Sequence, residues 1–232
     1  MIRPQINQLP GTADLIAAQT KVAGDPAVMR QIASTWRATS HRAADVSSSM
    51  VNFINDVDLK WEGDSADAFD TYMRRFPKAG EGLNTAVEAC AGSLDSTAKA
   101  FEDAKTGIAG LINEVIDGAV TQMTDYMNNH GGENGENYSK AMTSLSSSPT
   151  FTGLVSTKTT AAKGHVTKVE ESVAATQKTM NAQLPANVQD SGMGFFSAIP
   201  DPGGPDFDPG NKPIVWDITP YKDRTQLSGG NG

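Results

Sequence analysis

The feature that most constrains the fold is a series of apolar residues at alternating steps of three and four, which runs from Met29 to Met123 with one break. Such steps place apolar side chains on one narrow stripe of a helix and leave the other faces polar. Strands alternate with a step of two instead, so the pattern predicts long amphipathic helices that pack side by side. Core positions of a compact globule are the alternative, and the polar residues on every other face weigh against it.

The break lies at residues 59–64 and divides the pattern into two arms. The first arm is expected to start at Pro26, with Asp25 as its N-cap, because proline is well tolerated at the first helical position. Gly63 can adopt a positive φ, which lets the chain reverse so that the second arm runs back along the first. The residues expected to form the helix-pairing seam are Ile32, Trp36, Val46, Met50, Phe53, Phe69, Met73, Phe76, Leu83, Val87, Leu94, Phe101 and Ile108.

The two arms differ in length, and this difference leaves part of the seam uncovered. An arm of some 30 residues spans about 45 Å, and one of some 60 residues spans about 90 Å. The distal seam, from Phe101 to Met123, therefore needs another segment or another chain to cover it. A weaker helical pattern over residues 154–184 has a suitable length. Pro77 should remove a hydrogen bond from the second arm and bend it near residue 74.

Proline usage sets the remaining boundaries, because seven of the twelve prolines lie between residues 185 and 220. We expect an all-α, elongated antiparallel hairpin with a Trp-x-Gly turn, an extra C-terminal helix and a Pro/Gly-rich tail. Short helices are also expected at residues 12–22 and 138–145. The expected organisation is an N-terminal segment (1–25), the helical hairpin (26–127), a loop or linker (128–153), an additional helix (154–184) and a mostly extended or disordered tail (185–232).

Composition excludes several classes of function. The net charge is −8 and basic residues are not clustered, so a nucleic-acid interface is not expected. The single cysteine, Cys90, and the widely separated His41, His130 and His165 predict neither a metal centre nor a cofactor site. Residues 1–19 lack the apolar core of a secretory signal, and no apolar stretch is long enough to span a membrane.

No catalytic constellation emerges from the chemistry-bearing side chains. Three groups were considered: His165 with Glu170 and Glu171, His130 with Glu133 and Glu136, and Asp201 with Asp206 and Asp208. None includes a nucleophile and base at a workable spacing, and the acidic residues do not match a calcium loop. A solvated helix face and turns account for them better, so we expect no enzyme.

The break itself carries the most specific signal. Trp61-Glu62-Gly63, followed by Asp64-Ser65-Ala66-Asp67-Ala68-Phe69, resembles the WXG family of type VII secretion substrates over roughly residues 26–97. The resemblance implies two antiparallel helices joined at the Trp-x-Gly turn, and two such hairpins paired in a four-helix bundle that is exported by an ATP-driven machine. On physical grounds alone, Trp61 would more often plug the end of a core than contact a partner.

Three features depart from the family pattern. Many members, or their partners, carry a tyrosine followed four residues later by an acid, and none of the four tyrosines here has this arrangement. The chain is more than twice the usual length of the small members. Pro77 also interrupts a helix that is normally continuous.

These observations predict a non-enzymatic, type VII secreted or secretion-associated interaction protein, cytoplasmic before export. Its partners would be a second copy or a related helical hairpin, together with the secretion machinery, with Trp61 and the adjoining helix ends presented to that machinery. Two alternatives stay open. The chain is the targeting and linker region of a larger polymorphic toxin, or it is a monomeric structural bundle in which residues 154–184 cover the distal seam.

Overall fold

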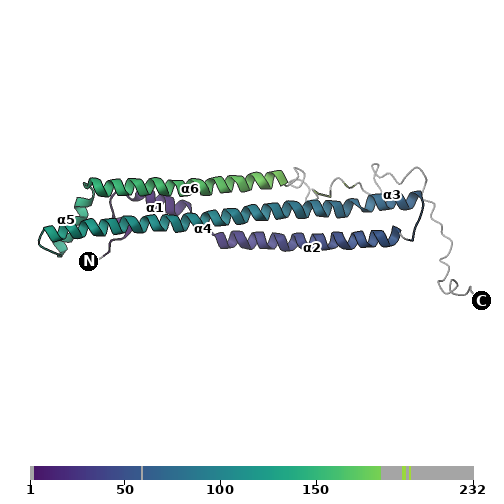
Figure 1. Ribbon diagram of the computed structural model, residues 1–232, viewed down its shortest axis with the longest axis horizontal. Coiled ribbons are helices and arrows are strands. Elements are labelled where there is room, and N and C mark those ends of the chain that lie inside the picture. Colours follow the sequence, from purple (N-terminus) through teal and green to yellow (C-terminus); the bar gives the residue numbers. More distant parts are fainter. Residues whose placement is uncertain (1–2, 59, 184–194, 197–198, 200–232) are drawn as a thin grey trace, which may run out of the picture.

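The computed structural model describes residues 3–58, 60–183, 195–196 and 199, and these residues form helices without any strand (Figure 1). A short 3-10 turn, η1, precedes six α-helices. The elements are η1 (Ile6–Gln8), α1 (Ala13–Lys21), α2 (Pro26–Asp58), α3 (Asp64–Met73), α4 (Arg75–Asn129), α5 (Gly135–Leu145) and α6 (Pro149–Gln183). The predicted all-α antiparallel hairpin with an additional helix is confirmed.

Helix α4 is the central rod of the molecule. Its 55 residues correspond to about 80 Å, whereas the 33 residues of α2 span only about 50 Å. In Figure 1, α2 lies along one half of α4, and α6 lies along the other half on a different side. The length argument is therefore confirmed, because α6 covers the distal seam that α2 leaves free.

The main core lies in this distal half, between α1, α4, α5 and α6. Leu15, Ile108, Met123, Leu145 and Phe151 are among its fully buried side chains. Each helix contributes a stripe of apolar residues to the core, so the four helices stabilise one another through burial rather than through intrinsic helix propensity.

Glycines of α4 allow its neighbours to approach closely. A Cβ added at Gly107 would lie 2.4 Å from Cε1 of His165, and one added at Gly118 would lie 2.4 Å from Cδ2 of Leu154. The two glycines are eleven residues apart, as are the two α6 residues that fill their places, so the antiparallel helices keep a constant register. These glycines weaken the helix intrinsically but make room for its partner.

A cluster of hydroxyl groups extends the contact between α4 and α6 toward its proximal end. Oγ1 of Thr97 lies 2.7 Å from Oγ1 of Thr176 and 3.1 Å from the carbonyl oxygen of Ser172. The hydroxyl of Thr176 in turn donates to the carbonyl of Ser93 at 2.9 Å. Because buried polar groups are costly when unpaired, these bonds favour one register of α6 on α4.

The bend predicted from Pro77 is present. Helix α3 ends at Met73 and α4 begins at Arg75, with Arg74 between them at φ −65° and ψ −13°. The proline ring clashes with the carbonyl four residues earlier, which is that of Met73, so the helical ladder is interrupted there.

Local capping explains where α2 and α6 begin. Asp25 accepts bonds from the amides of Ala27 and Val28 at 2.9 and 3.3 Å, as the predicted N-cap of α2 should. Helix α6 begins at Pro149 rather than at residue 154, because Ser148 caps it and proline suits the first position. Helices α1 and α5 correspond to the predicted short helices. The predicted tail, 185–232, lies outside the described residues except for 195–196 and 199.

Candidate partner-binding surface

The corner between α2 and α3 is built around Gly63, whose φ of 103° confirms the predicted positive value. A side chain is strained in this conformation, so glycine suits the turn. The Trp61 ring packs on Phe69 of α3 with a centroid distance of 5.5 Å, and 41% of the residue remains exposed. Trp61 therefore covers the first turns of α3 and does not plug the core, contrary to the expectation from physics alone.

Arg74 connects this corner to the end of α2. Its Nε donates to Oδ2 of Asp70 at 2.7 Å, and a terminal nitrogen donates to Oδ1 of Asn55 at 3.1 Å. The hydrogen bond to Asp70 is the main reason why the pKa of Arg74 is raised. The residue that ends α3 thus also fixes the position of α2 beside it.

Helix α2 contacts α4 along a line of buried residues at heptad spacing, of which the first three are small: Ala33, Ser40, Ser47 and Ile54. Ser40 bonds to the side chain of Asn84. A Cβ added at Gly80 would lie 2.0 Å from Oγ of Ser47. Small side chains on both helices therefore bring the two backbones close together.

The apolar residues predicted to pack α2 on the second arm lie one position away from this line. Ile32, Val46 and Phe53 are 40%, 62% and 56% exposed. Each immediately precedes a residue of the buried line, so it points about 100° around the helix from α4. The expectation that these residues face the second arm is wrong. The contact uses the smaller neighbours because they permit the closer approach.

The other predicted seam residues divide by depth. Phe101 and Ile108 are buried under α6 and α1, in the distal core. Partly buried positions lie along α2, α3 and the proximal part of α4: Trp36, Met50, Phe69, Met73, Phe76, Leu83, Val87 and Leu94. The structure thus leaves an apolar band on α2 and beside the corner, and we call Ile32, Val46, Phe53 and Val28 the exposed α2 face.

Ion pairs accompany the contact of α2 with α4. Arg30 pairs with Glu102, and Arg37 pairs with Asp95 and Glu88 at 2.7 and 3.2 Å. Hydrogen bonding to Arg30 is the main reason why the pKa of Glu102 is lowered. At about 100° per residue, Arg30 and Arg37 lie on the flank of the buried line opposite the exposed α2 face, which keeps that face free of these charges.

An apolar groove lies where α2, α4 and the end of α6 meet. It encloses about 230 Å³ and is lined by Trp36, Thr39, Ser40, Leu83, Val87, Cys90 and Met180. Cys90 is 3% exposed, and burial raises the pKa of its thiol. Cys90 therefore behaves as the small hydrophobic residue that its place in the pattern predicted.

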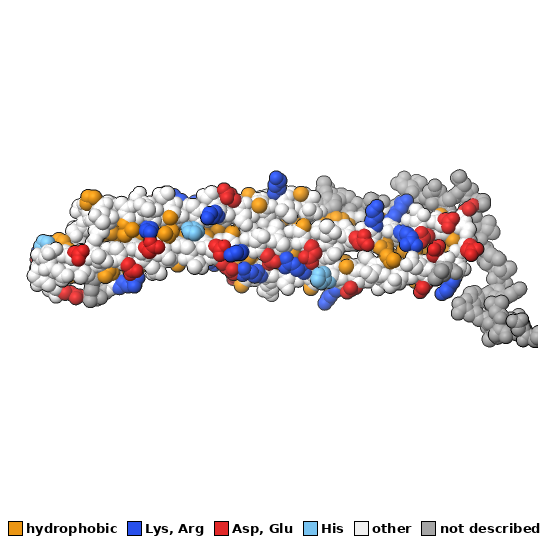
Figure 2. Space-filling model, in the orientation of Figure 1, with side chains coloured by type: hydrophobic (Ala, Val, Ile, Leu, Met, Phe, Trp, Pro, Cys, Tyr) orange, Lys and Arg blue, Asp and Glu red, His pale blue; other side chains and the backbone are white. Residues whose placement is uncertain are grey.

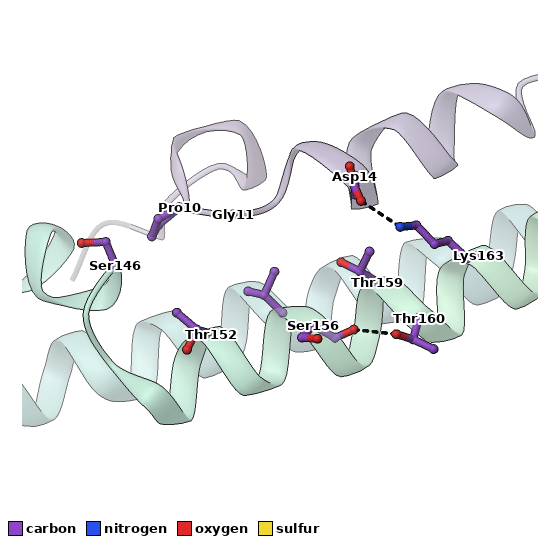
Figure 3. A pocket seen from close by; sticks show the side chains of 10 residues that line it. Pro10, Gly11, Asp14, Ser146, Thr152, Ser156, Thr159, Thr160 and Lys163 are labelled. Carbon is purple, nitrogen blue, oxygen red and sulfur yellow. Dashed lines mark hydrogen bonds and ion pairs between the residues drawn. The ribbon is translucent and has the colours of Figure 1, made fainter.

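A larger and more polar hollow of about 570 Å³ lies between α1 and α6 (Figure 3). At one end, Nζ of Lys163 binds Oδ2 of Asp14 at 2.8 Å, and this hydrogen bond is the main reason why the pKa of Asp14 is lowered. The hydroxyl group of Thr152 donates to the carbonyl of Ser148, directly before α6, and that of Thr160 donates to the carbonyl of Ser156, both at 3.0 Å. The lining contains no histidine or cysteine, and no sequence motif marks its residues as a site.

The histidines considered as catalytic candidates have structural surroundings. His165 is partly buried over Gly107, and so it is not the solvated histidine expected. The His130 ring stacks on Tyr126 at 4.0 Å and contacts the carbonyl oxygen of that residue at 2.7 Å. Within the described part of the chain, no three histidine, cysteine or acidic side chains are grouped to hold a metal ion.

Figure 2 shows acidic and basic side chains interspersed along the face in view, with apolar patches between them. None of the helices formed by the described residues is both long and apolar enough to cross a membrane. The surface features that remain are the exposed α2 face, the corner and the groove.

Comparison with known proteins supports the interpretation of the corner. Residues 21–106 match the model of the WXG100 family, described as proteins of 100 residues with WXG. The searches of curated proteins and of solved structures gave no match. The matched segment includes α2, the Trp61-Glu62-Gly63 turn, α3 and the proximal part of α4. The resemblance seen at the turn therefore agrees with the family model, which is similar to the chain over residues 21–106.

Proposed function

We propose that the chain is a non-enzymatic type VII secretion substrate, or a secretion-associated protein, that acts by pairing with a second helical hairpin. The partner is another copy of the chain or a related hairpin. The observation that carries this proposal is the exposed α2 face, on which Ile32, Val46 and Phe53 remain 40%, 62% and 56% exposed. Trp61 and the adjoining helix ends form the surface presented to the secretion machinery.

The angle between the two apolar lines of α2 supports pairing with helices. One line contacts α4, and the other is displaced by about 100° around the helix axis. A helix in a four-helix bundle contacts neighbours on two adjacent sides and needs apolar residues on both. Helix α2 has this arrangement, but only one of its two sides is occupied within the described chain.

The spacing of the exposed residues indicates the shape of the partner. Ile32, Val46 and Phe53 lie on one seven-residue repeat over about 30 Å of helix, with the exposed Thr39 at the intervening position. Solvent-exposed apolar stripes of this length are typical of interaction sites. A partner helix with the same repeat would bury them continuously, whereas a compact globular partner would meet them only locally.

The proposal is tested with Val46→Glu combined with Phe53→Glu in the full chain. Both residues are exposed, so helix content should be unchanged, while the charges prevent burial against a partner. The matched control is Ala38→Glu with Asn52→Glu, two exposed positions of α2 that point away from the exposed α2 face. Co-purification from the native host and light scattering would measure pairing with another hairpin or with a second copy.

We expect the native chain and the control to pair, and the Val46 and Phe53 variant to remain unpaired with normal helix content. A native chain that stays monomeric and captures no hairpin would contradict the proposal and favour the monomeric bundle. Trp61→Ala separately tests the corner: it should reduce export or partner capture more than helix content. Equal losses of both would assign Trp61 a structural role only.

A further inference from the structure

The face of α4 that α6 covers continues past the end of α6. Gly82 precedes Gly107 by 25 residues and Gly118 by 36 residues, which correspond to about seven and about ten helical turns. The three glycines therefore share one face of α4. Leu154 and His165 of α6 fill the places at Gly118 and Gly107, and the Phe195 ring lies against Gly82, where an added Cβ would be 3.4 Å from its Cδ1, an ordinary contact distance.

Other glycines of α4 show that these contacts depend on the face of the helix and not on the presence of a glycine. Gly92 and Gly110 point elsewhere, and nothing lies within 4 Å of a Cβ added at either. Gly80 points toward α2, where it meets Ser47. The three contacts made by the C-terminal part of the chain are thus collinear on α4.

The length of chain between α6 and Phe195 is sufficient for this position. The register set by Gly107 and His165 places Gln183, the last residue of α6, beside Ala89 of α4. Gly82 lies seven residues farther along α4, a distance of about 10 Å. The twelve steps from Gln183 to Phe195 span at most about 40 Å, so Phe195 reaches Gly82 without tension.

We propose that Gly82 and its neighbours on α4 form an intramolecular docking site in which Phe195 anchors this chain's own C-terminal segment. Phe195 and Phe196 are both partly buried, and the amide of Ile199 donates to the carbonyl of Phe196 at 3.0 Å, which closes a turn directly after the anchor. The occupant is the same chain because the contact extends the existing α4–α6 interface in line.

This docking site has a consequence for the partner-binding surface, and it stands whether or not the proposed pairing is correct. Phe195 lies on the α6 side of proximal α4, which leaves the exposed α2 face as the side open to a second hairpin. Its contact residue Gly82 lies seven residues from the start of α4, on the half of the molecule that carries the Trp61 corner.

Disulfide trapping tests the docking site in the full chain, with Cys90→Ala to remove the native thiol. Gly82→Cys with Phe195→Cys should form an intramolecular cross-link under mild oxidation, visible as a faster monomer band on a non-reducing gel. The matched control is Gly92→Cys with Phe195→Cys, which should cross-link at least ten-fold more slowly. A cross-link between two chains would overturn the proposal in favour of exchange between copies, and equal rates for both pairs would overturn it outright.

A second measurement does not depend on engineered cysteines. Gly82→Leu fills the place of the Phe195 ring, and chymotrypsin cleavage after Phe195 should become several-fold faster. Gly92→Leu, on the face without neighbours, should leave the cleavage rate as it is in the native chain. Unchanged cleavage in Gly82→Leu, with normal helix content, would show that Phe195 is not held at Gly82.

Discussion

Replacement of Gly80 by alanine probes the contact that defines the hairpin. The added Cβ would lie 2.0 Å from Oγ and 3.3 Å from Cβ of Ser47, and Oγ is already bonded to the carbonyl of Ala43 at 3.0 Å. Either the hydroxyl rotates and loses that bond, or the helices move apart. Overpacking costs about 1–3 kcal/mol and a lost hydrogen bond costs about 1 kcal/mol.

These costs oppose a favourable contribution from helix propensity, which is about 1 kcal/mol for glycine to alanine. We therefore expect Gly80→Ala to lower the free energy of unfolding by up to about 2 kcal/mol, which is the cost of overpacking less the gain in helix propensity. The matched control, Gly110→Ala, adds a Cβ that meets nothing within 4 Å, so it should raise the same quantity by up to about 1 kcal/mol. The two substitutions in one helix thus differ in sign.

The assay is urea denaturation followed by circular dichroism at helix wavelengths, with a thermal scan beside it. For a chain of this size, each kcal/mol corresponds to about 2–4 °C in Tm. Ser47→Ala added to Gly80→Ala removes the nearest atom and should restore at least half of the loss. If Gly80→Ala stabilises the protein as much as Gly110→Ala, α2 does not approach α4 at Gly80 and the packing described above is wrong.

Two further predictions concern the contacts of α6. Because the pKa of Asp14 is lowered by Lys163, their pair stabilises the docking of α1 at neutral pH, and this contribution is lost as the pH falls through the folded pKa, below the ordinary value of 3.8. The protection factors of the α1 amides, which correct for the intrinsic pH dependence of exchange, should therefore fall more steeply on acidification in the native chain than in Asp14→Asn, and identical profiles would contradict this role. Thr97→Val removes one hydroxyl from the buried cluster that it forms with Thr176, and it should lower the free energy of unfolding by about 1–3 kcal/mol in denaturant titrations. The control, Ser96→Ala, lies at an exposed position of the same helix and should have little effect. Equal losses in the two variants would exclude a special role for the cluster.

Several boundaries of the helical hairpin could be predicted from the sequence because short motifs mark them. Gly63 and the Trp61-Glu62-Gly63 triplet mark the reversal, Pro77 marks the interruption at Arg74, and Asp25 with Pro26 marks the start of α2. These signals are local, because each depends on the backbone chemistry of a few consecutive residues. The length of the arms then required a further segment on distal α4, and α6 lies there.

Local patterns along the chain predict the helices, the position of the hairpin turn and the apolar heptad repeat of α2. They do not predict which of two adjacent lines on α2 faces α4, because both repeat every seven residues and periodicity does not distinguish them. The line of smaller residues, with Ser40 and Ser47, forms the contact because it meets Gly80 at short range, and this leaves Val46 and Phe53 exposed for a partner. The register of distant segments likewise sets which glycines of α4 have a side chain of another segment packed against them. No local pattern specifies that register.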